Sequence, residues 1–342
     1  MNKLKYILVL KGTNKDLATF EFETLWETYF DEKIILKQIE NRVYSFQSQN
    51  IIEPTHQLLR RLTFTNYLGI VLNEGKNPLD LAKDLDFSYL ENKTFAIRNK
   101  GVRPKAEKSG FEERELAKPI WDSLKNPKVS LKNPDYEINY IFEERGENVY
   151  LTQKLYENEK DYIQRMPKFR PVKMPYTLKS DLARICINYL KLKDGIVLDP
   201  FCGIGGILLE AIDMKFEVIG NDISWNDLKY MKQNIEHYFP EAKYFRILAD
   251  SATQFLKDDI VDGIVTDIPY GRCCRKLGID LYENFLKNAK KYLKKGKRMV
   301  VVYANFVEFE NLARKYFKQI KKIDHYINRS MTRHILVLEN KK

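Results

Sequence analysis

The second half of the chain alternates short apolar runs with stretches of helical periodicity, and this alternation restricts the fold more than any other feature. The apolar runs are GIVLDPF, FEVIGND, YFRILAD, DGIVTDIPY and KRMVVVYANF. Strands separated by helices are typical of a largely parallel sheet with crossover helices. The last segments, IKKIDHYI and RHILVLEN, are joined by a short polar stretch and predict an antiparallel hairpin at the sheet edge. We therefore expect an α/β domain with a mostly parallel, seven-stranded sheet over residues 176–342.

The first half of the chain has a different pattern. Strand-like runs such as KYILVL and RVYSF are mixed with helical stretches such as DLATFEFETLWETYF, which predicts small α+β modules. A chain of 342 residues is too long for one small core, so two or more domains are expected. The stretch DYIQRMPKFRPVKMP contains three prolines and four basic residues with little periodicity. We interpret residues 156–175 as the linker between the halves.

Composition limits the partners and the compartment. The 58 Lys and Arg residues exceed the 47 Asp and Glu residues, and the net charge of +11 suits a polyanion such as RNA or DNA. Many thermophilic proteins also have Lys-rich surfaces, so the charge alone does not decide. The four cysteines form neither a CxxC pair nor a zinc pattern, which predicts a reduced, intracellular protein without a metal. The start MNKLKYILVLKG is too quickly polar for a signal peptide, and no apolar stretch reaches membrane-spanning length.

The first apolar run of the second half ends in a glycine-rich turn, LDPFCGIGGILLEA. Gly203, Gly205 and Gly206 let the backbone turn sharply and approach a ligand before the next helix. A dinucleotide fingerprint would need a third glycine at position 208, which is Leu208, so NAD is disfavoured. Asp199 at the start of the turn suits a cationic sulfonium with an amino acid tail, because a carboxylate accepts hydrogen bonds from an ammonium group.

The next two strands also end in acidic residues. Asp222 follows 23 residues after Asp199, where a carboxylate can take both hydroxyls of a ribose, with Ile223 beside it. Asp250, followed by Ser251, is placed to accept a hydrogen bond from an adenine amino group. One acidic strand terminus is an ordinary helix N-cap, but one at the end of each successive strand predicts a nucleoside cofactor.

The fourth strand ends in TDIPYGR, which suits chemistry on an aromatic amine. Such an amine is a poor nucleophile, and methylating it requires hydrogen-bond acceptors on both of its protons. Asp267 can accept one bond, and the Ile268 carbonyl, held outward by Pro269, can accept the other. Tyr270 offers a face on which the base can stack after it leaves its helix. The released proton could pass to Asp267 or to water, and a strand-end turn with an aspartate cap is the simpler alternative.

Together these residues resemble the S-adenosylmethionine-dependent methyltransferase fold, from residue 176 to residue 339. TDIPY resembles the Asp-Pro-Pro-Tyr motif of amino-methyltransferases, with Ile268 where the first proline is usual. The resemblance implies S-adenosylmethionine as the cofactor, with Asp199, Phe201, Gly203 and Gly205 around the methionine part, Asp222 at the ribose and Asp250 at the adenine edge.

The basic residues are the candidates for contact with RNA. Residues 56–155 resemble a THUMP RNA-binding domain, preceded in residues 1–55 by what resembles its ferredoxin-like companion. The candidates are Arg98, Lys100, Arg103 and Lys105 in this region, Arg272 after the tetrapeptide, and Arg329 and Arg333 in the turn of the terminal hairpin. A solvated loop or a stabilising turn explains each of these groups equally well.

The order of modules resembles the archaeal tRNA guanine-N2 methyltransferases, especially those that modify guanine-10. This resemblance rests on DPFCGIGG, TDIPYGR and RSMTRH, and it implies a cytoplasmic, monomeric enzyme that binds tRNA and delivers guanine to Asp267. A relative acting on guanine-6 shares the same parts. A DNA adenine-N6 methyltransferase usually has a sequence-reading domain instead, and a glutamine-N5 methyltransferase would favour Asn at position 267. An RNA-binding protein with an inactive domain is the alternative outside the enzymes.

Overall fold

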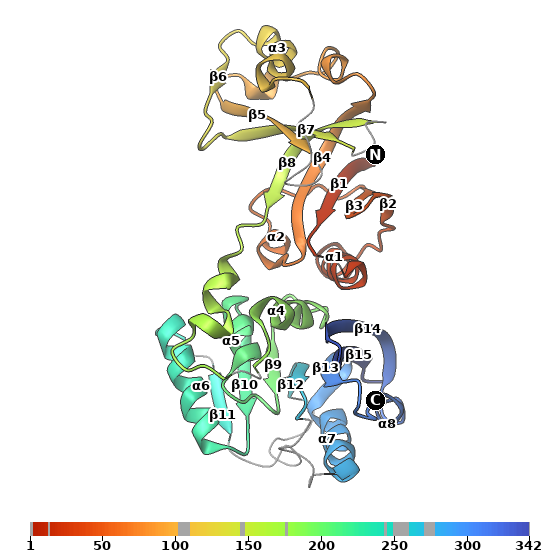
Figure 1. Ribbon diagram of the computed structural model, residues 1–342, viewed down its shortest axis with the longest axis vertical. Coiled ribbons are helices and arrows are strands. Elements are labelled where there is room, and N and C mark those ends of the chain that lie inside the picture. Colours follow the sequence, from red (N-terminus) through yellow and green to blue (C-terminus); the bar gives the residue numbers. More distant parts are fainter. Residues whose placement is uncertain are drawn as a thin grey trace. The chain divides into compact units, whose positions relative to one another are not determined.

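The structure is a computed structural model that describes residues 3–12, 14–101, 110–143, 148–174, 177–242, 245–248, 260–269 and 278–341 (Figure 1). The chain divides into two compact units. The first contains Met1–Thr19 and Lys33–Glu159, and the second contains Phe20–Glu32 and Lys160–Lys342. Helix α1 (Lys15–Phe30) is divided between the two units.

The first unit is built on one mixed sheet. Its strands are β1 (Leu4–Leu10), β2 (Lys37–Glu40), β3 (Val43–Ser48), β4 (Thr65–Gly75), β5 (Thr94–Gly101), β6 (Lys128–Val129), β7 (Tyr136–Phe142) and β8 (Val149–Glu157). They form an eight-stranded sheet in the order β2-β3-β1-β4-β8-β7-β5-β6. Strand β5 pairs in parallel with β6 and β7, and the other neighbours are antiparallel. One sheet thus runs through both ranges 1–55 and 56–155, and their assignment to ferredoxin-like and THUMP modules stays a prediction.

Helix α3 (Glu113–Ser123) covers part of this sheet, and α2 (Gln57–Arg61) is a short helix before β4. A capping box between Glu112 and Glu115 fixes the start of α3. Leu116 and Ile120 are four residues apart on one helix face, and both are fully buried in a core with Phe95 and other residues of the sheet. The strand, helix and strand expected in this region are therefore present as β5, α3 and β7. The basic loop between them, residues 102–109, lies outside the described residues.

The second unit contains the predicted seven-stranded sheet. Its strands are β9 (Ile196–Asp199), β10 (Glu217–Asn221), β11 (Phe245–Leu248), β12 (Val261–Asp267), β13 (Leu293–Ala304), β14 (Lys318–Asn328) and β15 (Met331–Glu339). The order is β11-β10-β9-β12-β13-β15-β14. The first five strands are parallel, and β15 runs antiparallel between β13 and β14. The mostly parallel sheet and its antiparallel edge hairpin are confirmed.

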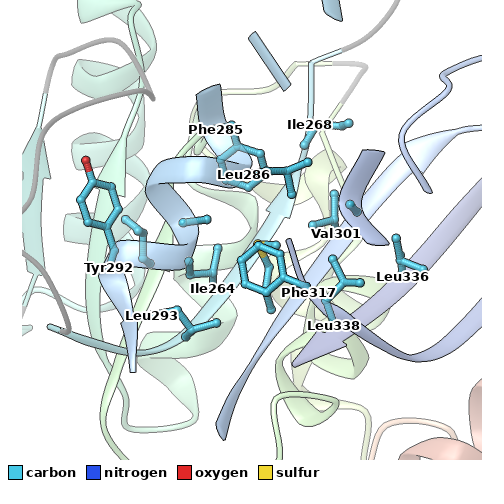
Figure 2. Close-up of a cluster of buried hydrophobic side chains, with 14 of the residues drawn as sticks. Ile264, Ile268, Phe285, Leu286, Tyr292, Leu293, Val301, Phe317, Leu336 and Leu338 are labelled. Carbon is cyan, nitrogen blue, oxygen red and sulfur yellow. The ribbon is translucent and has the colours of Figure 1, made fainter. Parts of the chain in front are cut away.

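The helices of this unit are α4 (Ser180–Asn188), α5 (Gly206–Asp213), α6 (Trp225–Tyr238), α7 (Gly278–Tyr292) and α8 (Glu310–Arg314). Helices α5 and α7 contact β10 and β13 respectively. Figure 2 shows how α7 is fixed to the sheet, with Phe285 and Leu286 turned into the same cluster as Ile264 and Val301. Strands β9 and β12 pair in parallel, so their carboxyl ends lie next to each other. Strand order reverses between these two strands, which is where ligands of such sheets bind.

Part of the expected linker is folded within the second unit. Residues Asp161–Arg165 and Pro167–Phe169 form two 3-10 turns. The Arg165 guanidinium donates to both carboxylate oxygens of Glu210 in α5, at 3.1 and 2.9 Å. Arg184 of α4 lies 3.2 Å from the same carboxylate, so these charges are buried as a group rather than singly.

Candidate active site

The glycine turn follows β9 and has the sharp geometry expected from its sequence. Gly203 and Gly205 have φ values of 48° and 84°, in the left-handed region that favours glycine. A Cβ atom on Gly205 would lie 2.6 Å from Cγ of Met231, so a larger residue there would also clash. The Gly205 N–H donates to the Cys202 carbonyl at 2.8 Å and closes the turn.

Asp222 connects the end of β10 to this turn. Its Oδ2 accepts the Gly203 N–H at 2.9 Å, and its Oδ1 accepts the Ser224 N–H at 2.9 Å. The neighbouring Ile223 is 78% exposed. The two predicted cofactor positions, the glycine turn and the end of the second strand, are therefore in direct contact.

Asp199 is a buried carboxyl group at the start of the turn, with 2% of its surface exposed. Its Oδ1 accepts the Thr266 hydroxyl at 2.7 Å and the Phe201 N–H at 3.2 Å. Burial raises the pKa of Asp199 to about 8, repulsion from Asp222 and Asp267 adds to the shift, and the two hydrogen bonds oppose it. A cation bound beside Asp199 would favour its ionised form.

Asn234 of α6 supports the turn from behind, and sequence reasoning missed it. This fully buried side chain donates to the Ile204 carbonyl at 3.2 Å and to the Val172 carbonyl at 3.3 Å, and it accepts the Val172 N–H at 3.0 Å. It therefore joins the segment before α4 to the glycine turn. The available signal was an amide between the apolar positions Met231 and Ile235 on the buried side of α6.

Asp267 is the last residue of β12, at the carboxyl end next to β9. The preceding Thr266 bonds to Asp199, so the predicted catalytic and cofactor carboxylates lie at the same edge of the sheet. The Asp267 Oδ2 lies 3.6 Å from Nη2 of Arg333. Arg333, predicted to contact RNA, is thus placed by the terminal hairpin against the predicted catalytic aspartate, with 11% of its side chain exposed.

Ile268 and Pro269 are held by the surrounding core. The Ile268 side chain is 1% exposed and belongs to the apolar cluster of α7 and β13 (Figure 2). Its N–H donates to the Val302 carbonyl at 3.0 Å. The Pro269 carbonyl accepts the Tyr282 hydroxyl at 2.8 Å. At position 268, a buried apolar side chain and a strand-type hydrogen bond therefore fix the backbone where related motifs have proline.

The remaining predicted site residues are distributed as follows. Phe201 packs against the apolar cluster, with its ring edge-on to Phe285 at 5.3 Å. Arg329 is exposed in the turn between β14 and β15. Tyr270, Asp250, Ser251, Arg103, Lys105 and Arg272 lie outside the described residues.

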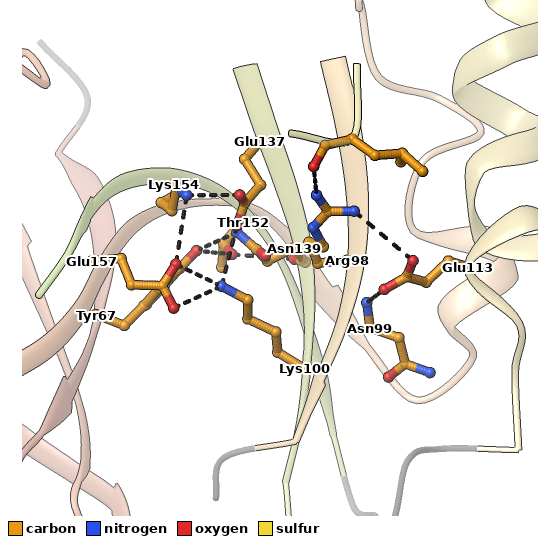
Figure 3. Close-up of polar contacts among 11 residues, drawn as sticks. Tyr67, Arg98, Asn99, Lys100, Glu113, Glu137, Asn139, Thr152, Lys154 and Glu157 are labelled. Atoms are coloured by element: carbon orange, nitrogen blue, oxygen red, sulfur yellow. Dashed lines mark hydrogen bonds and ion pairs between the residues drawn. The ribbon is translucent and has the colours of Figure 1, made fainter. Parts of the chain in front are cut away.

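Arg98 and Lys100 in the first unit already have partners (Figure 3). The Lys100 Nζ lies 3.1 Å from a Glu137 oxygen and 3.0 Å from a Glu157 oxygen. Arg98 donates to the Leu131 carbonyl. A phosphate would have to compete with these bonds, and contact between these two residues and RNA stays a prediction.

Within the described residues, no three His, Cys, Asp or Glu side chains are grouped so that they could hold a metal ion. None of the helices in the same part of the chain combines the length and apolar composition that a membrane crossing requires.

Two family models match the chain. The one described as "RMKL-like, methyltransferase domain" matches residues 167–335, which include the glycine turn and the end of β12. The other, described as "DNA methylase", matches residues 15–233 and stops before the TDIPYGR stretch. A solved structure, TrmN from Thermus thermophilus, has a TM-score of 0.50 and 18% identity, with 98% of this chain and 99% of that chain covered. This last likeness concerns the fold.

Two curated archaeal relatives are similar over most of their length. A protein of Methanothermobacter thermautotrophicus named tRNA (guanine(10)-N2)-dimethyltransferase is 31% identical over 292 residues, which are 82% of this chain and 84% of that protein. A protein of the same name from Methanocaldococcus jannaschii is 29% identical over 303 residues, 84% of each chain. The chain belongs to the tRNA (guanine(10)-N2)-dimethyltransferase family.

Proposed function

We propose that this protein transfers methyl groups from S-adenosylmethionine to the N2 amine of guanine-10 in tRNA, and that it adds two. The names of its relatives support the substrate. The observation that carries the proposal is the Thr266 hydroxyl bond to Asp199, 2.7 Å long, directly before Asp267 in the chain. Because Thr266 directly precedes Asp267, this bond holds Asp199, a carboxyl group suited to a cationic cofactor, close to Asp267, a carboxyl group suited to an amine.

The residues at the first two strand ends fit this cofactor. The buried Asp199 would accept hydrogen bonds from the ammonium group, and the Asp222 carboxylate would take the ribose hydroxyls. Gly203 and Gly205 leave room for close approach of the backbone. When bound, the cofactor supplies a methyl group activated by a sulfonium. Asp250 is proposed to bind the adenine amino group.

At the end of β12, two acceptors would act on the guanine amine. In the first transfer, the Asp267 carboxylate would accept a hydrogen bond from one N2–H, and the Ile268 carbonyl would accept a hydrogen bond from the other. These bonds weaken delocalisation of the nitrogen lone pair into the ring and aim it at the methyl carbon. The N2 proton then leaves to Asp267 or to water as the new nitrogen–carbon bond forms. Tyr270 is proposed to stack on the base.

The substrate base would have to leave its stack to reach this edge. The N-terminal unit is proposed to hold the rest of the tRNA as a THUMP-like module, and the net charge of the whole chain, +11, suits such a polyanionic partner. Arg329, exposed at the tip of the hairpin, is a candidate for phosphate contact. Monomeric action is the simplest assembly for this arrangement.

Labelled methyl incorporation into tRNA transcripts tests the proposal. Three unmodified transcripts should be compared: one with the natural sequence, one with adenine at position 10, and one with adenine at position 6. In the two substituted transcripts, the pairing partner of the new adenine is changed to match. We expect incorporation into the first and third transcripts and loss of incorporation into the second. Loss only with the third would support guanine-6 instead, and no incorporation into any tRNA would contradict the enzyme assignment.

A second candidate is methylation of an amino group on DNA, which the DNA methylase match favours. Duplex and single-stranded DNA belong in the same assay as acceptors. Efficient transfer to adenine in DNA, with none to tRNA, would replace the first proposal by this one.

A further inference from the structure

We propose that Tyr282 of α7 is a positioning residue for the catalytic end of β12, and that it acts through the main chain of Pro269. Its hydroxyl donates to the Pro269 carbonyl at 2.8 Å. Nothing in the sequence pattern around Tyr282 marks it as part of the site, because it lies 13 residues beyond Pro269. The inference rests on the proposed function for its kinetic readout, but its structural readout does not.

The hydrogen bond fixes the one backbone angle of Pro269 that its ring leaves open. The pyrrolidine ring holds φ near −65°, and proline also restricts the preceding Ile268 to extended conformations. Rotation about ψ of Pro269 would turn its carbonyl and redirect the chain toward residue 270. By holding this carbonyl, Tyr282 restricts that rotation at the end of the described strand.

Tyr282 can act as a fixed donor because its ring packs on the core. The ring stands edge-on to Phe309, with an interplanar angle of 90° and centroids 5.9 Å apart. Phe309 is fully buried and packs in turn on Phe285, at 6.4 Å, and on Tyr303, at 5.5 Å. An aromatic ring has few rotatable bonds, so a packed ring holds its hydroxyl in place at low entropic cost.

The Tyr282 bond completes a pair of anchors around the proposed acceptor. On one side, the Ile268 N–H is bound to the Val302 carbonyl at 3.0 Å. On the other, the Pro269 carbonyl is bound to Tyr282. The Ile268 carbonyl lies between these two points, and an acceptor must be held within about 0.5 Å and 10–20° to be productive. The second anchor therefore acts together with the buried Ile268 side chain and its N–H bond to hold the acceptor in place.

The substitution Tyr282→Phe tests this role, because it removes the hydroxyl and keeps the ring. We expect kcat for tRNA methylation to fall about ten- to a hundredfold, the effect typical of a misplaced catalytic group. The Kd for S-adenosylhomocysteine should stay within about twofold, since the Tyr282 hydroxyl is bonded to Pro269 and its ring packs on Phe309. A residue that only stabilises the fold would lower the melting temperature and leave kcat unchanged.

Tyr316→Phe is the matched control. The Tyr316 hydroxyl also donates over 2.8 Å, but its acceptor is the Glu283 carboxylate of α7 and not the main chain at the end of β12. We expect this variant to keep the wild-type kcat. Equal losses of kcat in both variants, or no loss in Tyr282→Phe, would overturn the inference.

Hydrogen exchange gives a second readout that needs no activity. In Tyr282→Phe, the Ile268 amide should exchange about fivefold faster than in the wild type, because the strand end loses an anchor. In Tyr316→Phe it should not. If wild-type protein methylated no tRNA, the proposed function would fail while this exchange result still decided the role of Tyr282. Unchanged exchange in Tyr282→Phe would contradict the positioning role itself.

Discussion

The two halves of the sheet in the second unit hold their functional groups in opposite ways. On the cofactor side, side-chain carboxylates accept main-chain N–H groups, as Asp222 does from Gly203 at 2.9 Å. On the catalytic side, the main chain of Ile268 and Pro269 is held by groups from other elements, the Val302 carbonyl and the Tyr282 hydroxyl. The carboxylates on the cofactor side therefore shape the turn and are also the proposed ligand-binding groups. On the catalytic side, the proposed functional atom is a backbone oxygen, the Ile268 carbonyl, which other elements hold in place. We expect variants of the two halves to separate affinity from rate.

The largest effect is expected from Asp267→Ala. Removing one acceptor of the amine protons should lower kcat by about 10²–10³, the range for loss of one preorganised polar group. The Kd for S-adenosylhomocysteine, measured by calorimetry, should stay within about twofold. Asp280→Ala, at an exposed aspartate of α7, is the control and should behave as wild type. A wild-type kcat in Asp267→Ala would remove this residue from the mechanism.

Asp222→Ala should show the opposite pattern. It loses a charged acceptor for the ribose and the bond that holds the Gly203 N–H, so the Kd for S-adenosylhomocysteine should rise about ten- to a hundredfold. At saturating cofactor, kcat should change far less than in Asp267→Ala. If Asp222→Ala lowered kcat at saturation and left the Kd unchanged, the division between the two halves would be incorrect.

The raised pKa of Asp199 predicts a pH dependence of stability. An unfolded aspartate titrates near 3.9, and the buried carboxyl has a pKa of about 8. Between these two pH values, Asp199 in the folded state therefore retains a proton that the same residue in the unfolded state has lost. The stabilising contribution is fully present below about pH 4 and is lost as the pH rises through about 8. Urea unfolding of the cofactor-free protein at several pH values should show this decline.

Asp199→Asn is the comparison for that measurement. The amide cannot ionise, so the difference in unfolding free energy between wild type and variant should change in favour of the variant as the pH rises from 5 to 8.5. A difference that stays constant over this range would show that Asp199 is ionised throughout.

The smallest effect is expected at the surface. Arg329→Ala should weaken tRNA binding about fivefold near physiological salt and reduce the slope of log affinity against log salt by about one. Lys100→Ala is the internal comparison, because Glu137 and Glu157 already offset the charge of Lys100. Its effect should be smaller than that of Arg329→Ala, and the reverse order would place the RNA contact in the first unit's ion-pair network.

Features that depend on local pattern could be predicted from the sequence. The parallel sheet follows from apolar runs between helical stretches, and the turn at Gly203 and Gly205 follows from the conformational freedom of glycine. The Ile268 carbonyl as the functional atom stays a prediction, and the burial of the Ile268 side chain in the core depends on packing that local pattern does not show.

Features that depend on distant contacts could not be predicted. Asn234 and Tyr282 act through residues 62 and 13 positions away in the chain, and their packing decides which atoms they meet. Arg333 is predicted to contact RNA, and its position beside Asp267 follows from the register of β15 against β13, which local pattern does not show. From the sequence, Lys100 is predicted to belong to a basic loop. Its partners Glu137 and Glu157 lie much later in the chain, in β7 and β8, so local pattern does not show these ion pairs.

The central claim is that this edge of the sheet methylates the N2 amine of guanine-10. Unmodified tRNA should be incubated with S-adenosylmethionine and wild-type or Asp267→Ala protein, digested to oligonucleotides and analysed by mass spectrometry. We predict that the fragment containing nucleotide 10 gains about 28 Da with the wild type, as two methyl groups replace the two N2 hydrogens to give N2,N2-dimethylguanosine, and that almost none of it is converted in the same time by the variant. An unmodified fragment with the wild type, or a methyl group on another base, would contradict the account.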